Sequence, residues 1–454
     1  MDYIPHTDAD RQAMLATIGV GEVADLFHDI PVAYRFPKLE LPPAASELEI
    51  LQELQRMSEE NVNLTHAASF LGAGAYRRFI PSVVDHIISR SEFFTAYTPY
   101  QPEMSQGTLQ ALFEYQTMIC ALTCMEVSNV SNYDGATSNA EAIIMALHVA
   151  RGVRRRVVLS PTLHPQYRAV ARTYTQGMGL SIVGDERLAN ADPEALASLC
   201  DDNTAAIIVQ NPDFLGYLCT PAEMRALAER VHKCGALFVV AVDPISLGLF
   251  VPPGAYGADI VVGEGQALGN TLSFGGPYLG LFACRMEHVR RSAGRIAGET
   301  TDTQGRRGFV LTLNTREQHI RREKATSNIC TNQALNALAA AVYLSALGKT
   351  GLRQVAELSY HKAHYAAGRI ASLKGYQVLQ ERPFFDEFVV RFPKPAAATN
   401  RYLREEWDII GGYDLSQDYP ELANHALICV TEMNSRAEID DLVDALAEAA
   451  EMSI

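Results

Sequence analysis

The chain has 454 residues, of which 48% are hydrophobic and 20% are charged, a balance typical of a globular protein with one large core and a smaller domain. Its formal net charge of −15 argues against nucleic acid as a partner, because an acidic surface repels phosphate backbones. No run approaches the ~18 uninterrupted apolar residues of a membrane helix, and the first residues lack a basic segment followed by an apolar core. We therefore expect no membrane association and a cytoplasmic location.

The eight cysteines are spread along the chain, and none forms a Cys-x-x-Cys pair. This spacing indicates neither a zinc site nor a thioredoxin-like dithiol. We therefore expect no metal in this protein.

Residues 1–65 are predicted to form an N-terminal arm that is broken by several prolines. Within the arm, residues 46–59 are predicted to be a helix, with Glu49 placed to form a capping box with Ser46.

Residues 66–330 are predicted to form a large domain in which strands and helices alternate. Helices are expected from Gly107 onward, from near Thr137 and over residues 221–231. Strands are expected at residues 157–159, 205–209, 237–242, 259–262 and 279–283. Short apolar strands separated by helices are typical of a mostly parallel sheet with helices on both faces, so the fold class is α/β.

Residues 331–454 are predicted to form a small C-terminal α+β domain. Helices are expected at residues 332–347, 352–373 and 438–452, and strands at residues 385–392 and 427–430.

The distribution of lysines is unusual. Only seven are present, with none between Lys38 and Lys233 and none between Lys233 and Lys324. The strand at 237–242 ends on Asp243, and the strand at 259–262 leads into a glycine-rich turn. This layout resembles that of enzymes that use pyridoxal phosphate (PLP), in which a carboxylate pairs with the ring nitrogen and a lysine forms a Schiff base. Where that lysine would be expected, this chain has Ala267.

Five segments resemble the glycine cleavage system P-protein family. They are residues 69–76 (SFLGAGAY), 97–107 (YTPYQPEMSQG), 115–118 (YQTM), 133–137 (YDGAT) and 321–331 (RREKATSNICT). The resemblance extends from about residue 60 to the C-terminus, and a match of eleven residues such as the one at 97–107 is highly specific.

The resemblance implies a type I PLP-dependent transferase fold, like that of aspartate aminotransferase. The length matches one half of the split bacterial form of the family, the half without the lysine, while glycine dehydrogenase subunit 2 binds PLP covalently. It further implies a heterotetramer that decarboxylates glycine and passes the aminomethyl group to the lipoyl arm of the H-protein. A structural subunit that only stabilises the PLP-bearing partner is the alternative. An active PLP enzyme that uses Lys324 is a third possibility.

Three positions correspond to cofactor contacts and are interpreted as vestigial. Asp243 lies where the carboxylate for the ring nitrogen belongs, His164 where a ring-stacking residue belongs, and Ala267 near the position of the lysine. Residues 134–139 have the composition of a phosphate-binding helix start, and an ordinary capped helix start is the alternative.

The 97–107 loop is predicted to line the active site of the partner subunit. Its candidate residues are Tyr97, Tyr100, Gln101, Ser105 and Gln106. Two prolines in the loop restrict its backbone and exclude a helix, and Ser105 is expected to cap the helix that follows. A rigid loop that serves only for packing is the alternative.

Thr326, Ser327 and Asn328 supply hydroxyl and amide groups ahead of a helix start. Related folds use a segment after the lysine strand to reach the PLP phosphate of the neighbouring subunit. We therefore predict cofactor contacts in trans from these residues. A helix cap at Thr331 is the alternative.

Overall fold

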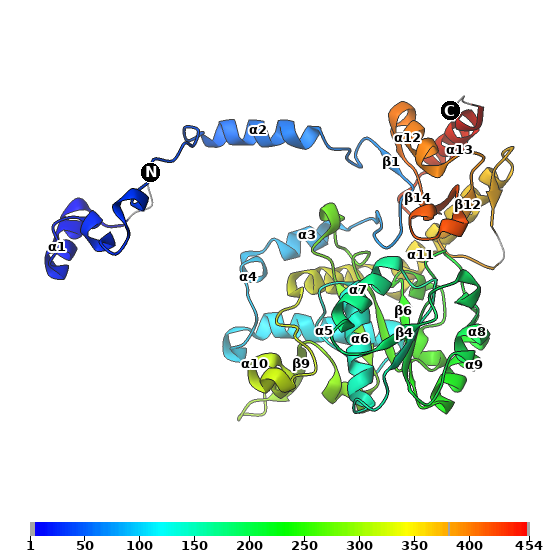
Figure 1. The fold of residues 1–454 in the computed structure, drawn as a ribbon, viewed down its shortest axis with the longest axis horizontal. Helices are drawn as coiled ribbons and strands as arrows, with labels where there is room; N and C mark the ends of the chain where they lie inside the picture. Colours follow the sequence, from blue (N-terminus) through cyan, green and yellow to red (C-terminus); the bar gives the residue numbers. More distant parts are fainter. Residues whose placement is uncertain (1–4, 380–381, 452–454) are drawn as a thin grey trace. The chain divides into compact units, whose positions relative to one another are not determined.

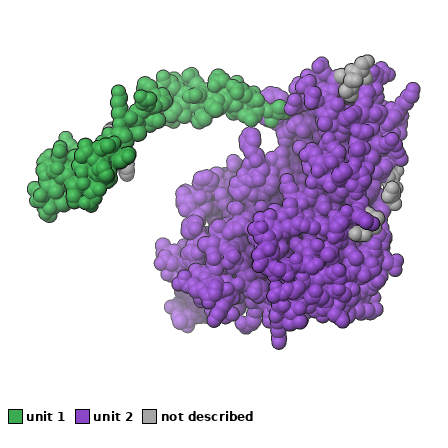
Figure 2. All heavy atoms as spheres, viewed as in Figure 1, with its two compact units in different colours: residues 1–62 green, residues 63–454 purple. Residues whose placement is uncertain are grey.

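The structure, a computed structural model, describes residues 5–379 and 382–451 of the chain. The chain forms two compact units, Met1–Val62 and Asn63–Ile454, which Figure 2 colours separately. The first unit contains the helices α1 (Asp8–Ile18) and α2 (Glu47–Glu59) and the short 3₁₀ helices η1 (Val23–Phe27) and η2 (Val32–Tyr34). The predicted capping box of α2 is confirmed, because Ser46 and Glu49 each accept a hydrogen bond from the other's backbone amide.

The second unit is built on a seven-stranded sheet in the order β2-β8-β7-β6-β5-β3-β4. The five strands from β7 to β4 are parallel, whereas β8 is antiparallel to β7 and β2 is antiparallel to β8. The predicted mostly parallel sheet is therefore confirmed. The strands are β2 (Val127–Ser128), β3 (Arg156–Leu159), β4 (Ser181–Val183), β5 (Thr204–Gln210), β6 (Leu237–Val242), β7 (Ile260–Glu264) and β8 (Gly280–Cys284).

Helices cover both faces of this sheet, because successive side chains of a strand point to opposite faces. In β3, Val158 packs into a cluster with residues of α5 and α9, whereas Val157 and Leu159 pack into a cluster with residues of α6. Figure 1 shows these helices around the sheet. The helices of this part are α3 (Ser82–Ile88), α4 (Ser91–Phe94), α5 (Gln106–Thr123), α6 (Gly135–Val149), α7 (Pro165–Thr175), α8 (Pro193–Ser198) and α9 (Pro221–Lys233).

A second core surrounds a four-stranded antiparallel sheet in the order β11-β12-β15-β14. Side chains of α12, α13 and the second half of the long helix α11 pack into this core. A parallel pair of strands, β1 and β13, joins the start of the unit to its C-terminal part. The elements are β1 (Ala68–Ser69), α11 (Ala334–Ala371), β11 (Gln377–Val378), β12 (Glu387–Arg391), α12 (Ala396–Trp407), β13 (Ile409–Ile410), β14 (Tyr413–Asp414), β15 (His425–Cys429) and α13 (Arg436–Glu451).

The structure contains elements that the sequence did not predict, among them α3, α7, β4, α8 and α12, and it differs most clearly in two regions. The two helices expected at 332–347 and 352–373 form one element, α11, with a single break at Gly348. An antiparallel hairpin of β9 (Ile296–Thr301) and β10 (Arg307–Thr312), followed by the short helix α10 (Gln318–Arg321), occupies a region where no element was expected. The predicted C-terminal helix is confirmed as far as Glu451, and Met452 lies outside the described residues.

Arg78, in the loop between β1 and α3, joins the two sheets and is 6% exposed. Its guanidinium donates to Asp386 Oδ2 at 2.5 Å and to Glu432 Oε2 at 2.9 Å, next to β12 and β15 of the smaller sheet. Asp243 Oδ2, directly after β6 of the larger sheet, lies 3.7 Å from the same guanidinium. Since buried charges lose their hydration, they must compensate one another, and this cluster holds the two sheets together.

Among the described residues, no helix is long and apolar enough to cross a membrane. The expected domain boundaries at residues 65 and 330 stay predictions.

A substitution at Gly348 tests why α11 breaks at this residue. Its φ of 58° and ψ of −175° form a conformation that strains any residue with a β-carbon, although no atom lies within 4 Å of an added one. We expect Gly348→Ala to lower the free energy of unfolding by about 1–3 kcal/mol. Gly368→Ala, in the same helix and also facing open space, should be neutral or stabilising by up to about 1 kcal/mol. Urea denaturation measures both, and equal effects would show that the positive φ is not required.

Candidate functional site

The 97–107 loop leads from α4 into α5 and turns large side chains outward. Residues 97–101 have no helical structure, as predicted, but Pro102–Met104 form a 3₁₀ helix, because proline is tolerated at the first position of a helix. Pro99 is buried, whereas Tyr97 and Met104 are about four-fifths exposed and Tyr100 is half exposed. An outward cluster of tyrosine and methionine side chains is typical of a surface that meets another molecule.

Gln106 anchors the end of this loop. Its amide donates to the Phe309 carbonyl at 2.8 Å and accepts from the Phe309 amide at 2.8 Å, which fastens the loop to β10. Ser105 occupies the N-cap position of α5, but its hydroxyl makes no capping hydrogen bond, so the predicted side-chain cap is wrong. The reason is its backbone, with φ −123° and ψ 23°, which is not the extended conformation of a capping serine. Gln101 is exposed.

Arg295 lies just before β9 and binds both predicted surface segments. It donates to Tyr100 Oη at 3.0 Å, and its guanidinium carbon lies 5.4 Å from the centre of the Tyr100 ring. The same guanidinium donates to the Cys330 carbonyl and to Asn332 Oδ1 at 3.0 Å. Arg295 is only 5% exposed, and Glu317 lies 3.6 Å from its Nε. The 97–107 loop and the residues around Cys330 therefore share one buried cation.

Residues of α6 and of the turn before it form hydrogen bonds with the 326–331 segment. Ser327 is buried and donates to Glu141 Oε1 at 2.7 Å, and the Cys330 amide donates to Tyr133 Oη at 3.3 Å. Thr326 is partly buried and Asn328 is exposed. Among the three predicted residues, Asn328 is therefore the one presented to the outside. Thr331 does not cap α11, whose N-cap residue is Gln333.

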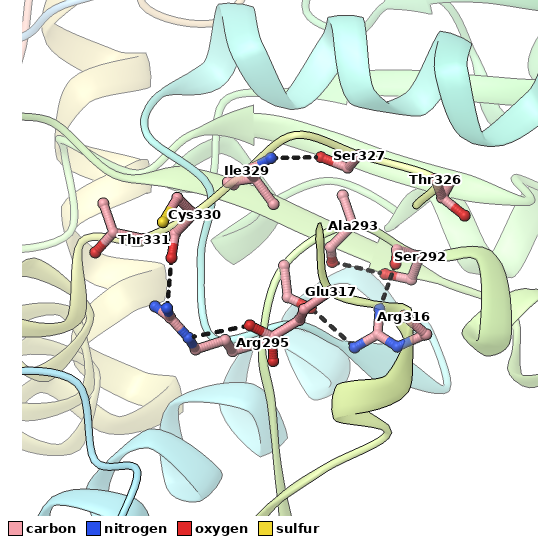
Figure 3. A pocket seen from close by; sticks show the side chains of 11 residues that line it. Ser292, Ala293, Arg295, Arg316, Glu317, Thr326, Ser327, Ile329, Cys330 and Thr331 are labelled. Carbon is pink, nitrogen blue, oxygen red and sulfur yellow. Dashed lines mark hydrogen bonds and ion pairs between the residues drawn. The ribbon is translucent and has the colours of Figure 1, made fainter. Parts of the chain in front are cut away.

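A narrow cavity lies beneath this segment, and Figure 3 shows Arg295 between Cys330 and Glu317 at its side. Arg316 also faces it and donates to the carbonyls of Ser292 and Gly294. The cavity is lined by Ser292, Ala293, Gly294, Arg295, Arg316, Glu317, Thr326, Ser327, Ile329, Cys330 and Thr331.

Sequence reasoning missed Arg295 and Glu141. The only local signal for Arg295 was a single charge within the small apolar run at 293–297, and Glu141 lay within a predicted helix. A charged residue in an apolar stretch is often buried and paired, so both positions were detectable as unusual, but their partners are distant in the chain.

His164, Asp243 and Ala267 lie after the carboxyl ends of β3, β6 and β7, the edge at which α/β folds bind ligands. His164 Nδ1 accepts a hydrogen bond from the Gln166 amide at 3.1 Å, so Nε2 carries the proton and donates to the Ala73 carbonyl at 2.9 Å. Burial lowers the pKa of His164. Ala267 is 2% exposed.

The residues at this edge do not fit PLP. A phosphate needs free amides at a helix start, but the Gly135 amide of α6 donates to Glu264 Oε2 at 2.9 Å and the Thr137 amide donates to Asp134 Oδ1 at 2.7 Å. The capping box of Asp134 and Thr137 makes this an ordinary capped helix start, the alternative to phosphate binding. Asp243, which a ring nitrogen would need, lies beside the guanidinium of Arg78 instead.

Comparison with known proteins agrees with this architecture. A sequence model of the family "Glycine cleavage system P-protein" matches residues 1–446. The chain is 54% identical over 452 residues to a probable glycine dehydrogenase (decarboxylating) subunit 1 of Thermomicrobium roseum, covering 99% of this chain and 100% of the relative. It is 50% identical to the protein of the same name from Geobacillus kaustophilus, covering 98% of both chains.

A crystal structure of glycine decarboxylase (P-protein) of the glycine cleavage system in inhibitor-bound form is similar, with a TM-score of 0.89 and 42% identity, covering 99% of this chain and 100% of that one. Mouse CSAD in apo form, at 17% identity and a TM-score of 0.68 over 95% of this chain and 92% of that one, shares the fold alone. The predicted type I PLP-dependent transferase fold is thus confirmed. Its relatives at 50% identity or more carry the name probable glycine dehydrogenase (decarboxylating) subunit 1. The chain therefore belongs to the glycine cleavage system P-protein family.

Proposed function

We propose that this chain is subunit 1 of a two-subunit glycine dehydrogenase (decarboxylating, aminomethyl-transferring) and that it completes the active site of subunit 2, which binds PLP covalently. The observation that carries the proposal is the meeting of the 97–107 loop and the 326–331 segment on one buried cation, Arg295. The names of the relatives support it, since a subunit 1 implies a second subunit. A heterotetramer and a cytoplasmic location stay predictions.

The proposed reaction converts glycine and oxidised lipoyl H-protein into CO₂ and an aminomethylated lipoyl arm. The bond from carbon to the carboxylate breaks, the electron pair forms a bond to one sulfur of the lipoyl disulfide, and the other sulfur is released as a thiol after taking up a proton. PLP held by subunit 2 supplies the electron sink for this chemistry.

Side chains of this chain have positioning roles in the proposal. Tyr97, Tyr100 and Asn328 are exposed at the two segments and offer hydroxyl and amide groups to a facing pocket. When a partner covers them, water is excluded, and hydrogen bonds to a charged substrate become stronger in the drier environment. The Arg295 contacts hold the two segments in one arrangement before the partner binds, which reduces the entropy lost on assembly.

A purely structural subunit is the second candidate function. The observation in its favour is Ser327, which is buried and donates to Glu141, so its hydroxyl is already used within the chain. Variants of the exposed groups distinguish the two candidates.

The first test measures exchange of the glycine carboxyl group with bicarbonate by the complex with subunit 2. We expect Tyr97→Phe, Gln101→Ala and Ser105→Ala together to reduce exchange by about ten-fold or more, because positioned groups commonly contribute on this scale. Tyr174→Phe, on α7, is the matched control and should leave exchange unchanged. Normal exchange by an intact triple-variant complex would instead support the structural subunit.

Arg295→Lys tests the shared cation. Lysine keeps the charge but loses the planar fork that serves Tyr100, Cys330 and Asn332 together. We expect a loss of about 2–4 kcal/mol in the free energy of unfolding and a larger fall in exchange than the triple variant shows. Arg307→Lys is the control, since its exposed pair with Glu299 contributes less than about 1 kcal/mol. If Arg295→Lys behaves like Arg307→Lys in urea denaturation, the shared cation is not what holds the segments.

Burial of Glu141 leads us to expect that the stability of the fold depends on pH. Burial raises the pKa of Glu141 from the ordinary 4.5 to about 7, although the Ser327 hydroxyl lowers it in part, and Oε2 has no hydrogen-bond partner among the described residues. The folded state therefore keeps a proton that the unfolded state releases. The stabilisation that this proton gives the folded state is complete below the pKa of Glu141 in the unfolded chain, and it is lost as the pH rises through about 7.

Glu141→Gln keeps an acceptor for Ser327 and cannot ionise. We expect its stability relative to the wild type to increase by up to about 3 kcal/mol between about pH 5 and pH 8. Exposed Glu287 provides the control substitution, Glu287→Gln, which should show no such trend. Thermal melting across this range measures both, and parallel curves for the wild type and Glu141→Gln would contradict the expectation.

A further inference from the structure

Three side chains lie at the edge of the sheet that carries His164 and Asp243: Tyr167, Glu264 and Arg78. A bound PLP would need a face for its ring, amides for its phosphate and a carboxylate for its ring nitrogen. In this chain, the ring face, the amides and the carboxylate each already contact a side chain of the chain itself.

Tyr167 covers the ring position. It stacks on His164, with ring centroids 5.0 Å apart and an angle of 19° between the planes. Its hydroxyl lies against the start of α6, where a β-carbon added to Gly135 would be 1.9 Å from Tyr167 Oη. The ring thus extends from the stacking histidine to the helix start at which a phosphate would bind.

The electrostatic surroundings of Tyr167 agree with this position. Burial raises its pKa well above the ordinary range, and the negative charges of Glu264, Asp134 and Asp243 add to the effect. Asp134 and Glu264 lie at the helix start, whereas Asp243 lies after β6. The contact at Gly135 likewise places the phenol hydroxyl beside the helix start that would meet a phosphate.

Glu264 occupies the place of the phosphate. Its carboxylate accepts hydrogen bonds from the backbone amides of Gly135 at 2.9 Å, Gln266 at 3.0 Å and Leu279 at 3.0 Å. A carboxyl group that accepts several backbone amides, one of them at the start of a long helix, takes up the donors that a phosphate would use. Burial raises the pKa of Glu264 to about 8, although the hydrogen bonds from these three amides lower it in part.

We infer that Tyr167, Glu264 and Arg78 stand in for the ring, the phosphate and the ring-nitrogen charge of PLP, so that this chain is closed to the cofactor by its own packing as well as by the lack of a lysine. The inference goes beyond the proposed function because it concerns this chain alone, and it holds whether or not the chain completes the site of subunit 2. Removing the substituting side chains should reopen a binding site.

The direct test is the double variant Tyr167→Ala/Glu264→Ala in the full-length chain, titrated with pyridoxine 5′-phosphate, which has no aldehyde to react with surface lysines. We expect saturable binding at least about ten-fold tighter than that of the wild type, measured by calorimetry. The control Tyr256→Ala/Glu223→Ala removes the same residue types near α9. Binding by the folded double variant that is no tighter than that of the control overturns the inference.

The single variant Glu264→Ala isolates the phosphate position. It should bind inorganic phosphate at least about ten-fold more tightly than the wild type, because the Gly135 amide loses its partner. Equal phosphate binding by both proteins contradicts the role given to Glu264.

A second measurement needs no ligand and tests the position of Tyr167, on which the inference depends, even if the double variant does not fold. Gly135→Ala should strongly lower the melting temperature, because the added carbon meets the Tyr167 hydroxyl. Tyr167→Ala removes that hydroxyl and the ring carbon that carries it, and it should restore part of the loss when combined with Gly135→Ala, since the Glu264 amide nitrogen stays 2.9 Å from the added carbon. If the two effects simply add, Tyr167 does not lie over the start of α6.

Discussion

One buried guanidinium, that of Arg78, is the constraint on which the second unit depends. It lies among Asp386, Glu432 and Asp243, which lie next to strands of the two different sheets. Burial raises the pKa of Asp386 and of Asp243, and the charge of Arg78 opposes that rise. Removing the cation would leave uncompensated carboxylates in the interior, which costs several kcal/mol, so the relative position of the sheets is tied to this residue.

The same cluster also determines the edge of the larger sheet. Beside it, Glu387 accepts hydrogen bonds from the Ala73 amide at 2.7 Å and from the Tyr76 hydroxyl at 2.9 Å, which holds the loop that carries Arg78. Since that loop covers the carboxyl end of β6, the charge beside Asp243 is supplied from within the chain. This internal pairing of Asp243 with Arg78 is one basis of our inference that the edge is closed to a cofactor in this chain.

Arg295 is likewise a buried cation with several hydrogen-bond partners, and it lies at the surface that we propose faces subunit 2. At both positions the acceptors are spread around one buried cation, and two nitrogens of the planar guanidinium reach them, whereas the lysine ammonium has all its donors on a single nitrogen. The composition matches this use, because lysines account for only 7 of the 38 basic residues. The scarcity of lysine, first noticed as a missing Schiff-base residue, thus accompanies two structural sites that require arginine.

The sequence by itself determined the central strands of the large sheet, the capped start of α2 and the family, because each depends on neighbouring residues or on a long specific motif. At the start of α6 it left phosphate binding and an ordinary cap as alternatives. It did not reveal the hairpin of β9 and β10, whose polar strands lack a strong apolar alternation, or the backbone of Ser105 that prevents a cap. Only the tertiary structure showed that Arg295 joins two segments and that Tyr167 covers Gly135. These contacts link residues that local patterns do not relate, and they form only when the sheet brings its loops together at one edge.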